Sequence, residues 1–243
     1  MISPITGMFP GEKYRPVRPV ELPDRTWPSR SVEKAPRFCS VDLRDGNQAL
    51  VIPMEPEKKA RMFRTLVGMG FSEIEVGFPS ASQPDFDFVR WLSDSGAVPS
   101  HTWVQILSQA RSHLIEKSFE AIQGLNRVIF HVYNSTSPAQ RQYVFQKSRE
   151  EVIQIAVDSV RQIKSLRSRF SGEMILEYSP ESFSATEPEF ALEISHAVME
   201  EWAPFDPGSL IINLPSTVEV TTPNLFADQI EWFCRNLNNR EDV

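Results

Sequence analysis

An arginine and an aspartate stand side by side directly after a short apolar run, and their types could support chemistry on a charged ligand. The run, Arg37–Leu43, lies between Pro36 and Gly46 and predicts a β-strand. Arg44 and Asp45 follow it, and such residues are rarely buried without a partner. Two interpretations are open on this pattern alone. It is a surface ion pair beside a turn, or a site that holds a metal ion and an anionic substrate.

Composition sets limits on the class of protein. The 243 residues are 41% hydrophobic and 23% charged, which is typical of a globular chain with a sizeable core. The net charge of -7 argues against nonspecific nucleic-acid binding, which needs a basic surface. No apolar stretch approaches the roughly 20 residues that span a bilayer. Cys39 and Cys234 are interpreted as reduced core thiols. A cytoplasmic protein without nucleic-acid or membrane partners fits these features.

The first 36 residues are predicted to form an extended arm. They contain no apolar segment of the kind found in signal peptides, and their proline content disfavours an amphipathic targeting helix. An arm of this type would wrap a surface or a partner. We therefore divide the chain into an arm, 1–36, and a catalytic domain, 37–243. The prolines of the arm's first part are Pro4, Pro10, Pro16, Pro19 and Pro23.

Six apolar segments rich in Val, Ile, Phe or Leu predict strands that are buried on both faces. They are Arg37–Leu43, Glu73–Gly77, Thr102–Leu107, Arg127–Val132, Met174–Tyr178 and Leu210–Asn213.

Helical segments alternate with these strands. Ser148 with Glu151 has capping-box spacing, and Thr186 with Glu189 repeats it. Thr222 followed by Pro223 suits the start of the last helix. Six βα units fit either an open doubly wound sheet or an incomplete (β/α)8 TIM barrel. The absence of a Gly-rich phosphate loop after the first strand favours the barrel.

Polar residues gather where the predicted strands end. In parallel α/β folds, ligands bind at the carboxyl ends of the strands. At least five of the six predicted ends carry hydroxyl, amide, imidazole or carboxylate groups, which favours an active site over an isolated surface ion pair. His101, His113 and His196 lie elsewhere and are interpreted as structural. The candidate site residues are Arg44, Asp45, His131, Ser179, Glu181 and Thr217.

Four segments together resemble a known family. The segment Asp42–Leu50 is similar to the signature of the Claisen-condensing α-isopropylmalate synthase family of (β/α)8 barrels, and Glu73–Ser82, Tyr178–Glu181 and Asn213–Pro223 fit the same subgroup. The resemblance runs from about Pro23 onward. Arg-Asp-Gly alone is shared with relatives such as hydroxymethylglutaryl-CoA lyase, whereas the combination is more specific.

The resemblance implies an acyltransferase of leucine biosynthesis that condenses acetyl-CoA with 2-oxoisovalerate to give 2-isopropylmalate. It implies that Asp45 ligates a divalent metal, Mg²⁺ before Mn²⁺ or Zn²⁺, which acts as a Lewis acid on the keto group. Arg44 would neutralise negative charge on the substrate or the developing alkoxide. His131, Ser179, Glu181 and Thr217 would contact the substrate, and Glu181 is also a candidate for proton transfer. The complete enzyme is expected to be a homodimer.

The chain also departs from the family pattern. The family completes its metal site with a His-x-His pair on strand seven, and this sequence contains no His-x-His. We therefore expect an N-terminal portion of a longer synthase, without strands seven and eight, the linker and the regulatory domain. Alone, such a portion is expected to be inactive and to self-associate through open sheet edges. A homocitrate or citramalate synthase fragment and a non-enzymatic remnant are the alternatives.

Overall fold

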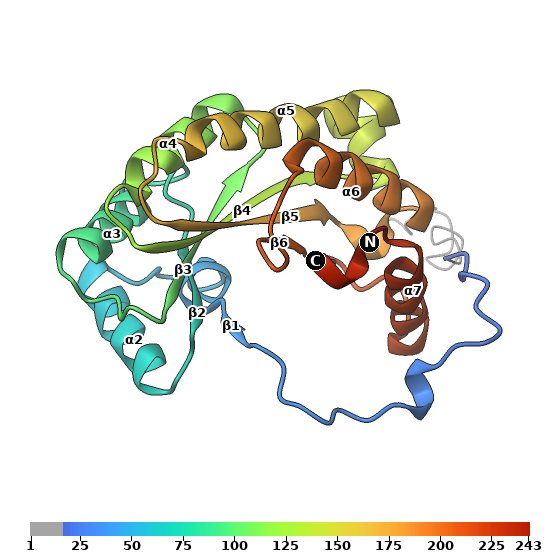
Figure 1. Ribbon diagram of the computed structural model, residues 1–243, viewed down its shortest axis with the longest axis horizontal. Coiled ribbons are helices and arrows are strands. Elements are labelled where there is room, and N and C mark those ends of the chain that lie inside the picture. The colour runs from blue at the N-terminus through green and yellow to red at the C-terminus, as the bar shows by residue number, and fades with distance from the viewer. Residues whose placement is uncertain (1–16) are drawn as a thin grey trace, which may run out of the picture.

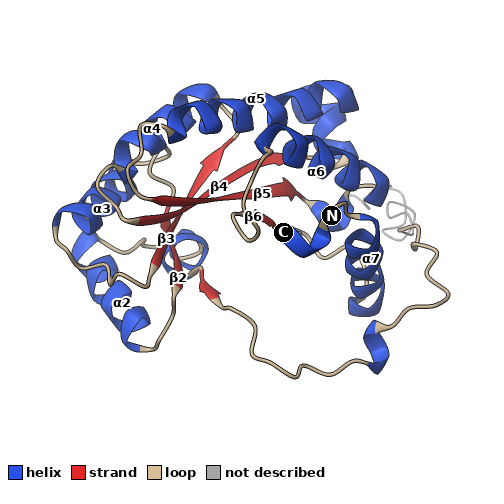
Figure 2. Cartoon of the chain, viewed as in Figure 1, coloured by secondary structure: helices blue, strands red, loops and turns tan. Residues whose placement is uncertain are grey.

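The computed structural model describes residues 17–243, and these form one curled parallel sheet with helices packed along its convex side (Figure 1). The strand order within the described residues is β1-β2-β3-β4-β5-β6, and every neighbouring pair is parallel. Figure 2 shows the alternation of strands and helices along the curl. This is the (β/α)8 type of architecture with six strands present, as the sequence predicts, and the doubly wound alternative is wrong.

Within the described residues, six strands form the sheet and six α-helices pack against it. The strands are β1 Cys39–Ser40, β2 Glu73–Gly77, β3 Trp103–Gln109, β4 Arg127–Ser135, β5 Glu173–Glu181 and β6 Leu210–Ile212. The helices are α2 Pro56–Gly68, α3 Gln83–Asp94, α4 Ser112–Ile122, α5 Arg149–Arg167, α6 Pro188–Trp202 and α7 Pro223–Asn236. Short helical turns are η1 Trp27–Ser29, η2 Asp42–Gly46, η3 Gln140–Phe145, η4 Phe183–Ala185 and η5 Arg240–Asp242.

The two faces of the sheet differ in chemistry because side chains alternate along a strand. The outer face carries Ile74, Val104, Val128 and Met174 in register, and these pack with the helices in the main apolar core. The inner face carries polar side chains at several positions. The buried polar residues of that face include Glu75, Gln105, His131, Glu177 and Ser179.

Two of the helix starts predicted from the sequence are confirmed, and one is wrong. Ser148 and Glu151 form the predicted capping box at the start of α5, with Ser148 Oγ accepting from the Glu151 N–H. Pro223 opens α7, as predicted. The box predicted from Thr186 is wrong, because α6 has Glu187 at its N-cap. The Thr186 hydroxyl donates instead to the Ser182 carbonyl at 2.8 Å.

The first strand is shorter than predicted. Beyond Ser40 the chain turns into η2, a π-helical turn in which the Gly46 N–H donates to the Val41 carbonyl at 3.1 Å. Leu43 is fully buried and anchors this turn in the core. Arg44 and Asp45 therefore lie on a helical turn at the carboxyl end of β1 rather than directly after an extended strand.

The described part of the predicted arm runs from α7 to β1 along the open side of the sheet (Figure 1). Arg25 Nε and Trp27 Nε1 donate to Asp228 Oδ1 on α7 at 2.8 and 2.7 Å. The Thr26 and Trp27 N–H groups donate to the Glu231 carboxylate. Residues 1–16, with Pro4, Pro10 and Pro16, lie outside the described residues. Among residues 17–243, no helix has the length and apolar character to cross a membrane.

Candidate functional site

Arg44 is drawn inward from η2, while its neighbour Asp45 stays at the surface. Arg44 Nε donates to Glu75 Oε2 at 2.6 Å, and Nη1 donates to Asp45 Oδ1 at 3.0 Å. The Arg44 side chain is 19% exposed and that of Asp45 is 66% exposed. The pair is thus an ion pair beside a turn, and at the same time it connects to a buried carboxylate on β2.

Glu75 lies at the centre of the site, although it is not among the residues predicted from the sequence. Its side chain is fully buried, and Oε1 lies 2.9 Å from His131 Nδ1 and accepts from Gln105 Nε2 at 3.3 Å. Burial alone would raise the pKa of Glu75, but the hydrogen bond and charge of His131, together with Arg44, lower it below its ordinary value. A carboxylate flanked by Ile74 and Val76 in a predicted buried strand is the signal that points to it.

His131 lies in the middle of β4, because that strand continues to Ser135. The prediction that places it at a carboxyl end is therefore wrong, because two inner-face residues, Tyr133 and Ser135, follow it in the strand. Its Nε2 lies 2.7 Å from Ser179 Oγ, and Asn213 Nδ2 donates to the same oxygen at 2.8 Å. Burial lowers the pKa of His131, but the charge of Glu177 and the hydrogen bond and charge of Glu75 outweigh burial and raise it.

Glu181 and Thr217 lie at the same end of the sheet with other partners. Glu181, the last residue of β5, accepts from Ser135 Oγ at 2.6 Å. Thr217, in the exposed loop after β6, accepts from the Ser182 N–H at 3.0 Å. Burial, with the negative charge of Glu181 adding to it, raises the pKa of Tyr133. The structure thus joins Arg44, His131 and Ser179 in one network and places Glu181 and Thr217 beside its outer end.

Cys39 of β1 contacts the network through Gln105. Its Sγ lies 3.5 Å from Gln105 Oε1. Burial, reinforced by the charges of Glu75, Glu177 and Glu73, raises the pKa of the thiol to about 12. The thiol therefore stays protonated at neutral pH, which does not suit a nucleophile. Cys234 and Cys39 are both free, in agreement with the interpretation of reduced thiols.

The fit of the site to a divalent metal rests on Asp45. Hard divalent cations take about six oxygen ligands, several of which come from carboxylates or water. Within residues 17–243, no three His, Cys, Asp or Glu side chains are grouped so that they could hold an ion. Asp45 offers one carboxylate, and Arg44 already contacts it. The described residues therefore supply one ligand and do not form a complete metal site.

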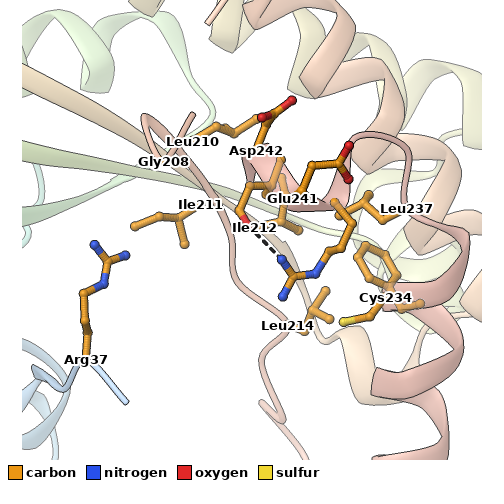
Figure 3. Close-up of a pocket in the computed structure, with 13 residues that line it drawn as sticks. Arg37, Gly208, Leu210, Ile211, Ile212, Leu214, Cys234, Leu237, Glu241 and Asp242 are labelled. Atoms are coloured by element: carbon orange, nitrogen blue, oxygen red, sulfur yellow. Dashed lines mark hydrogen bonds between the residues drawn. The ribbon is translucent and has the colours of Figure 1, made fainter. Parts of the chain in front are cut away.

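A cavity of about 340 Å³ lies away from this network, between β6 and α7 (Figure 3). Leu210 and Ile212 line it from β6, and Phe233 and Leu237 line it from α7 and its end. The charged Arg37, Arg240, Glu241 and Asp242 also line it, and none of the candidate site residues contributes to it. The cavity therefore follows from the unpaired margin of β6 rather than from the chemistry of the inner face.

A curled parallel sheet with a charged network on its inner face, which Arg44 joins from the carboxyl end of β1, is a scaffold of the (β/α)8 class. Comparison with known families places it further. The family model described as HMGL-like matches residues 35–243, so the chain belongs to the HMGL-like family.

Curated relatives narrow the comparison. The chain is 55% identical over 231 residues to a 2-isopropylmalate synthase of Agrobacterium fabrum and 56% identical over 231 residues to one of Rhizobium johnstonii. Each match covers 95% of this chain and 41% of the relative, so the chain spans about two fifths of the length of these proteins. The resemblance to the α-isopropylmalate synthases is thereby confirmed.

A solved structure agrees with the fold. The HMG-CoA lyase of Bacillus subtilis superposes with a TM-score of 0.57 at 17% identity, covering 82% of this chain and 64% of the lyase. At this identity the likeness concerns the fold alone. It supports the assignment of the curled sheet to the (β/α)8 class.

Proposed function

We propose that this chain contributes the Arg44–Asp45 side of the active site of a 2-isopropylmalate synthase, which joins acetyl-CoA to 2-oxoisovalerate. The observation that carries the proposal is the 55% identity over 95% of the chain to a protein of that name. In this reaction a base removes a proton from the acetyl methyl group, and the resulting carbanion bonds to the keto carbon. The keto oxygen then takes up a proton, and water cleaves the thioester to release CoA.

Arg44 is proposed to neutralise the negative charge that gathers on the oxo acid. Its guanidinium has five N–H donors. One of them is held by Glu75 and one by Asp45, so the others can meet a ligand. Because Glu75 fixes the guanidinium before a ligand arrives, little reorganisation accompanies binding. A preorganised cation of this kind stabilises an alkoxide better than a freely rotating one.

Asp45 is proposed to supply one ligand to a divalent metal in the longer protein, with Mg²⁺ preferred and Mn²⁺ or Zn²⁺ as alternatives. When bound, such an ion polarises a keto group. The exposed carboxylate of Asp45 supports this role, since it projects from η2 at the carboxyl end of β1. His131, Ser179, Glu181 and Thr217 are proposed contacts of the oxo acid, and Glu181 is proposed to take part in proton transfer.

The setting of the site is part of the same proposal. We propose an arm, 1–36, and a partial catalytic barrel, 37–243, within a longer cytoplasmic protein that forms a homodimer. Its substrates are small molecules, and the net charge of -7 gives no support to a nucleic-acid partner.

A hybrid protein tests this function. Residues 1–243 would replace the matching segment of the Agrobacterium fabrum relative, and CoA release would be followed with a thiol reagent. We expect CoA release that requires an oxo acid and prefers 2-oxoisovalerate over 2-oxoglutarate and pyruvate. In the hybrid, Arg44→Gln should lower kcat by about 100-fold or more. Glu173→Gln, at the exposed start of β5, is the matched control that retains activity.

Two results would contradict the proposal. One is a hybrid that unfolds at the same temperature as its parent and yet releases no CoA. The other is an active hybrid that prefers 2-oxoglutarate or pyruvate, which would indicate the homocitrate or citramalate reaction. The chain 1–243 alone is predicted to be inactive, because the described residues supply a single ligand for the metal.

A further inference from the structure

Glu177 is a second buried carboxylate that faces His131. The two residues are register partners on β5 and β4, and Glu177 Oε1 lies 3.5 Å from His131 Nδ1. The Glu177 side chain is 9% exposed. Together with Glu75, it encloses the Nδ1 edge of the imidazole between two acidic groups, at 2.9 and 3.5 Å.

The charges of the buried network balance when His131 carries two protons. Arg44, which also contacts the exposed Asp45, offsets Glu75, and a positively charged His131 offsets Glu177. From the neighbouring elements, β1 presents the protonated Cys39 thiol, and β2 presents Glu73, which pairs with Arg37 at 3.5 Å. The neighbours from β3 and from β6 with the residue after it are uncharged, and the next inner residue of β4 is Tyr133. These uncharged neighbours are Gln105, Leu107, Ile211 and Asn213.

The directions of titration agree with this balance. Burial raises the pKa of Glu177, with Glu75 and Glu73 adding to the shift and His131 opposing it. The pKa of His131 is also raised, so both members of the pair retain protons more strongly than they would in water.

We propose that Glu177 is a positioning residue that keeps His131 doubly protonated and thereby frees the Ser179 hydroxyl hydrogen to bind a ligand. With both ring nitrogens protonated, Nε2–H donates to Ser179 Oγ, which also accepts from Asn213 Nδ2. Two accepted bonds fill the lone pairs of that oxygen, so its hydrogen must turn to another acceptor. With a neutral His131 protonated on Nδ1, the Ser179 hydroxyl donates to Nε2 instead.

A single proton on His131 therefore decides whether Ser179 can donate to a ligand. A ligand with a carboxylate or keto oxygen is the kind that such a donor would bind. The identity of that ligand as an oxo acid rests on the proposed function, whereas the protonation of His131 does not. Ligand binding should weaken as the pH rises through the pKa of His131.

Nitrogen NMR of the imidazole groups tests the inference on the chain itself. The wild-type protein should show both nitrogens of His131 protonated at pH 7, with His131→Asn identifying its signals among the four histidines. In Glu177→Gln the pKa of His131 should fall by about one unit or more, a tenfold loss of proton affinity. Glu173→Gln, on the same strand but 61% exposed and paired with Arg127, should leave the titration unchanged.

An unchanged pKa of His131 in Glu177→Gln would overturn the inference. So would a wild-type His131 whose Nε2 is unprotonated at pH 7. The wild-type measurement also decides the matter if Glu177→Gln does not fold. In the hybrid protein, Glu177→Gln should raise KM for the oxo acid at pH values between the His131 pKa of the variant and that of the wild type, and Ser179→Ala should remove this pH dependence. A shifted titration in an inactive hybrid would support this inference and contradict the proposed function. An active hybrid in which the titration of His131 is unshifted would support the proposed function and contradict this inference.

Discussion

Glu75 on β2 accepts a 2.6 Å hydrogen bond from Nε of Arg44, which lies 31 residues earlier in the chain. The contact joins the first polar motif of the sequence to the second strand. Since the carboxylate is fully buried and its other oxygen contacts His131, the orientation of Arg44 and that of His131 depend on the same side chain. Buried ion pairs of this kind cost much when one partner is removed, because the remaining charge stays out of water.

Replacing Glu75 should therefore destabilise the fold. Glu75→Gln leaves Arg44 without its buried counter-charge, and we expect a loss of about 3 kcal/mol in the free energy of unfolding. Urea denaturation followed by circular dichroism measures this change. Glu173→Gln removes a 61% exposed carboxylate from the Arg127 ion pair and should cost less than about 1 kcal/mol. Equal losses in the two variants would show that burial of Glu75 is not what matters.

Two glycines give a steric test of the packing. A Cβ on Gly172 would lie 2.6 Å from the carbonyl oxygens of Asn126 and Leu125, so Gly172→Ala should cost about 1–3 kcal/mol. Gly68, at the end of α2, has no atom within 4 Å of such a Cβ. Gly68→Ala should stabilise the protein by roughly 0.5–1 kcal/mol, because alanine is the better helix former. Thermal unfolding of both variants measures the difference, and a neutral Gly172→Ala would contradict the packing before β5.

The stability of the fold should depend on Glu187 in acid. Burial alone would raise the pKa of Glu187, but hydrogen bonds from Arg141, from its own backbone N–H and from Arg149 lower it to about 2. Arg141 holds both carboxylate oxygens, at 2.7 and 2.9 Å. A depressed folded-state pKa contributes stability above the ordinary value of 4.5, and this contribution disappears as the pH falls toward 2.

Urea midpoints measured between about pH 2.5 and pH 6 would show this contribution. In Glu187→Gln the loss of stability on acidification should be smaller than in the wild type. Glu189→Gln, at an exposed position two residues further along, should follow the wild-type curve. If the Glu187→Gln and wild-type curves have the same slope, the carboxylate does not contribute in this pH range.

The arm should loosen when its contact with α7 is broken. Asp228 is buried and accepts from both Arg25 and Trp27, so Asp228→Asn removes the negative charge that strengthens both hydrogen bonds. Bonds of this type contribute about 1.5–3 kcal/mol, which predicts an increase of about tenfold or more in protease cleavage within the exposed segment 28–37. Limited proteolysis with mass spectrometry measures the rate. Glu193→Gln, at an exposed position on α6, is the control and should be cleaved at the wild-type rate. A wild-type rate in Asp228→Asn would show that other contacts hold the arm.

The apolar segments of the sequence predict the order and type of all six strands, because the outer face of the sheet is continuously apolar. The carboxyl ends of the strands are less predictable. Tyr133, Ser135 and Glu181 belong to β4 and β5, but their polarity resembles that of a loop. In this fold the inner face is polar, so the strands continue where hydrophobicity stops. At β1 the reverse holds, since η2 interrupts an apolar run that favours a longer strand.

The candidate site shows the same limit. Arg44, His131 and Ser179 are identifiable from their positions after or within apolar strands. Glu75 and Glu177 stand out only as carboxylates within apolar strands, and their role depends on a partner across the sheet. His131 lies 56 residues from Glu75, and no local pattern reports that contact.

The edge strands of the sheet are much shorter than its central strands, and this limits how another polypeptide could add a strand to it. β4 and β5 contain nine residues each, whereas β1 contains two and β6 three. A strand added at either edge could pair with the backbone of only two or three residues, which is too few to hold it by hydrogen bonds alone. Beside β6 it would also meet the cavity against α7, where the apolar Leu210 and Phe233 lie together with the charged Arg37 and Glu241. Side chains rather than backbone would therefore decide which strands could bind at this margin.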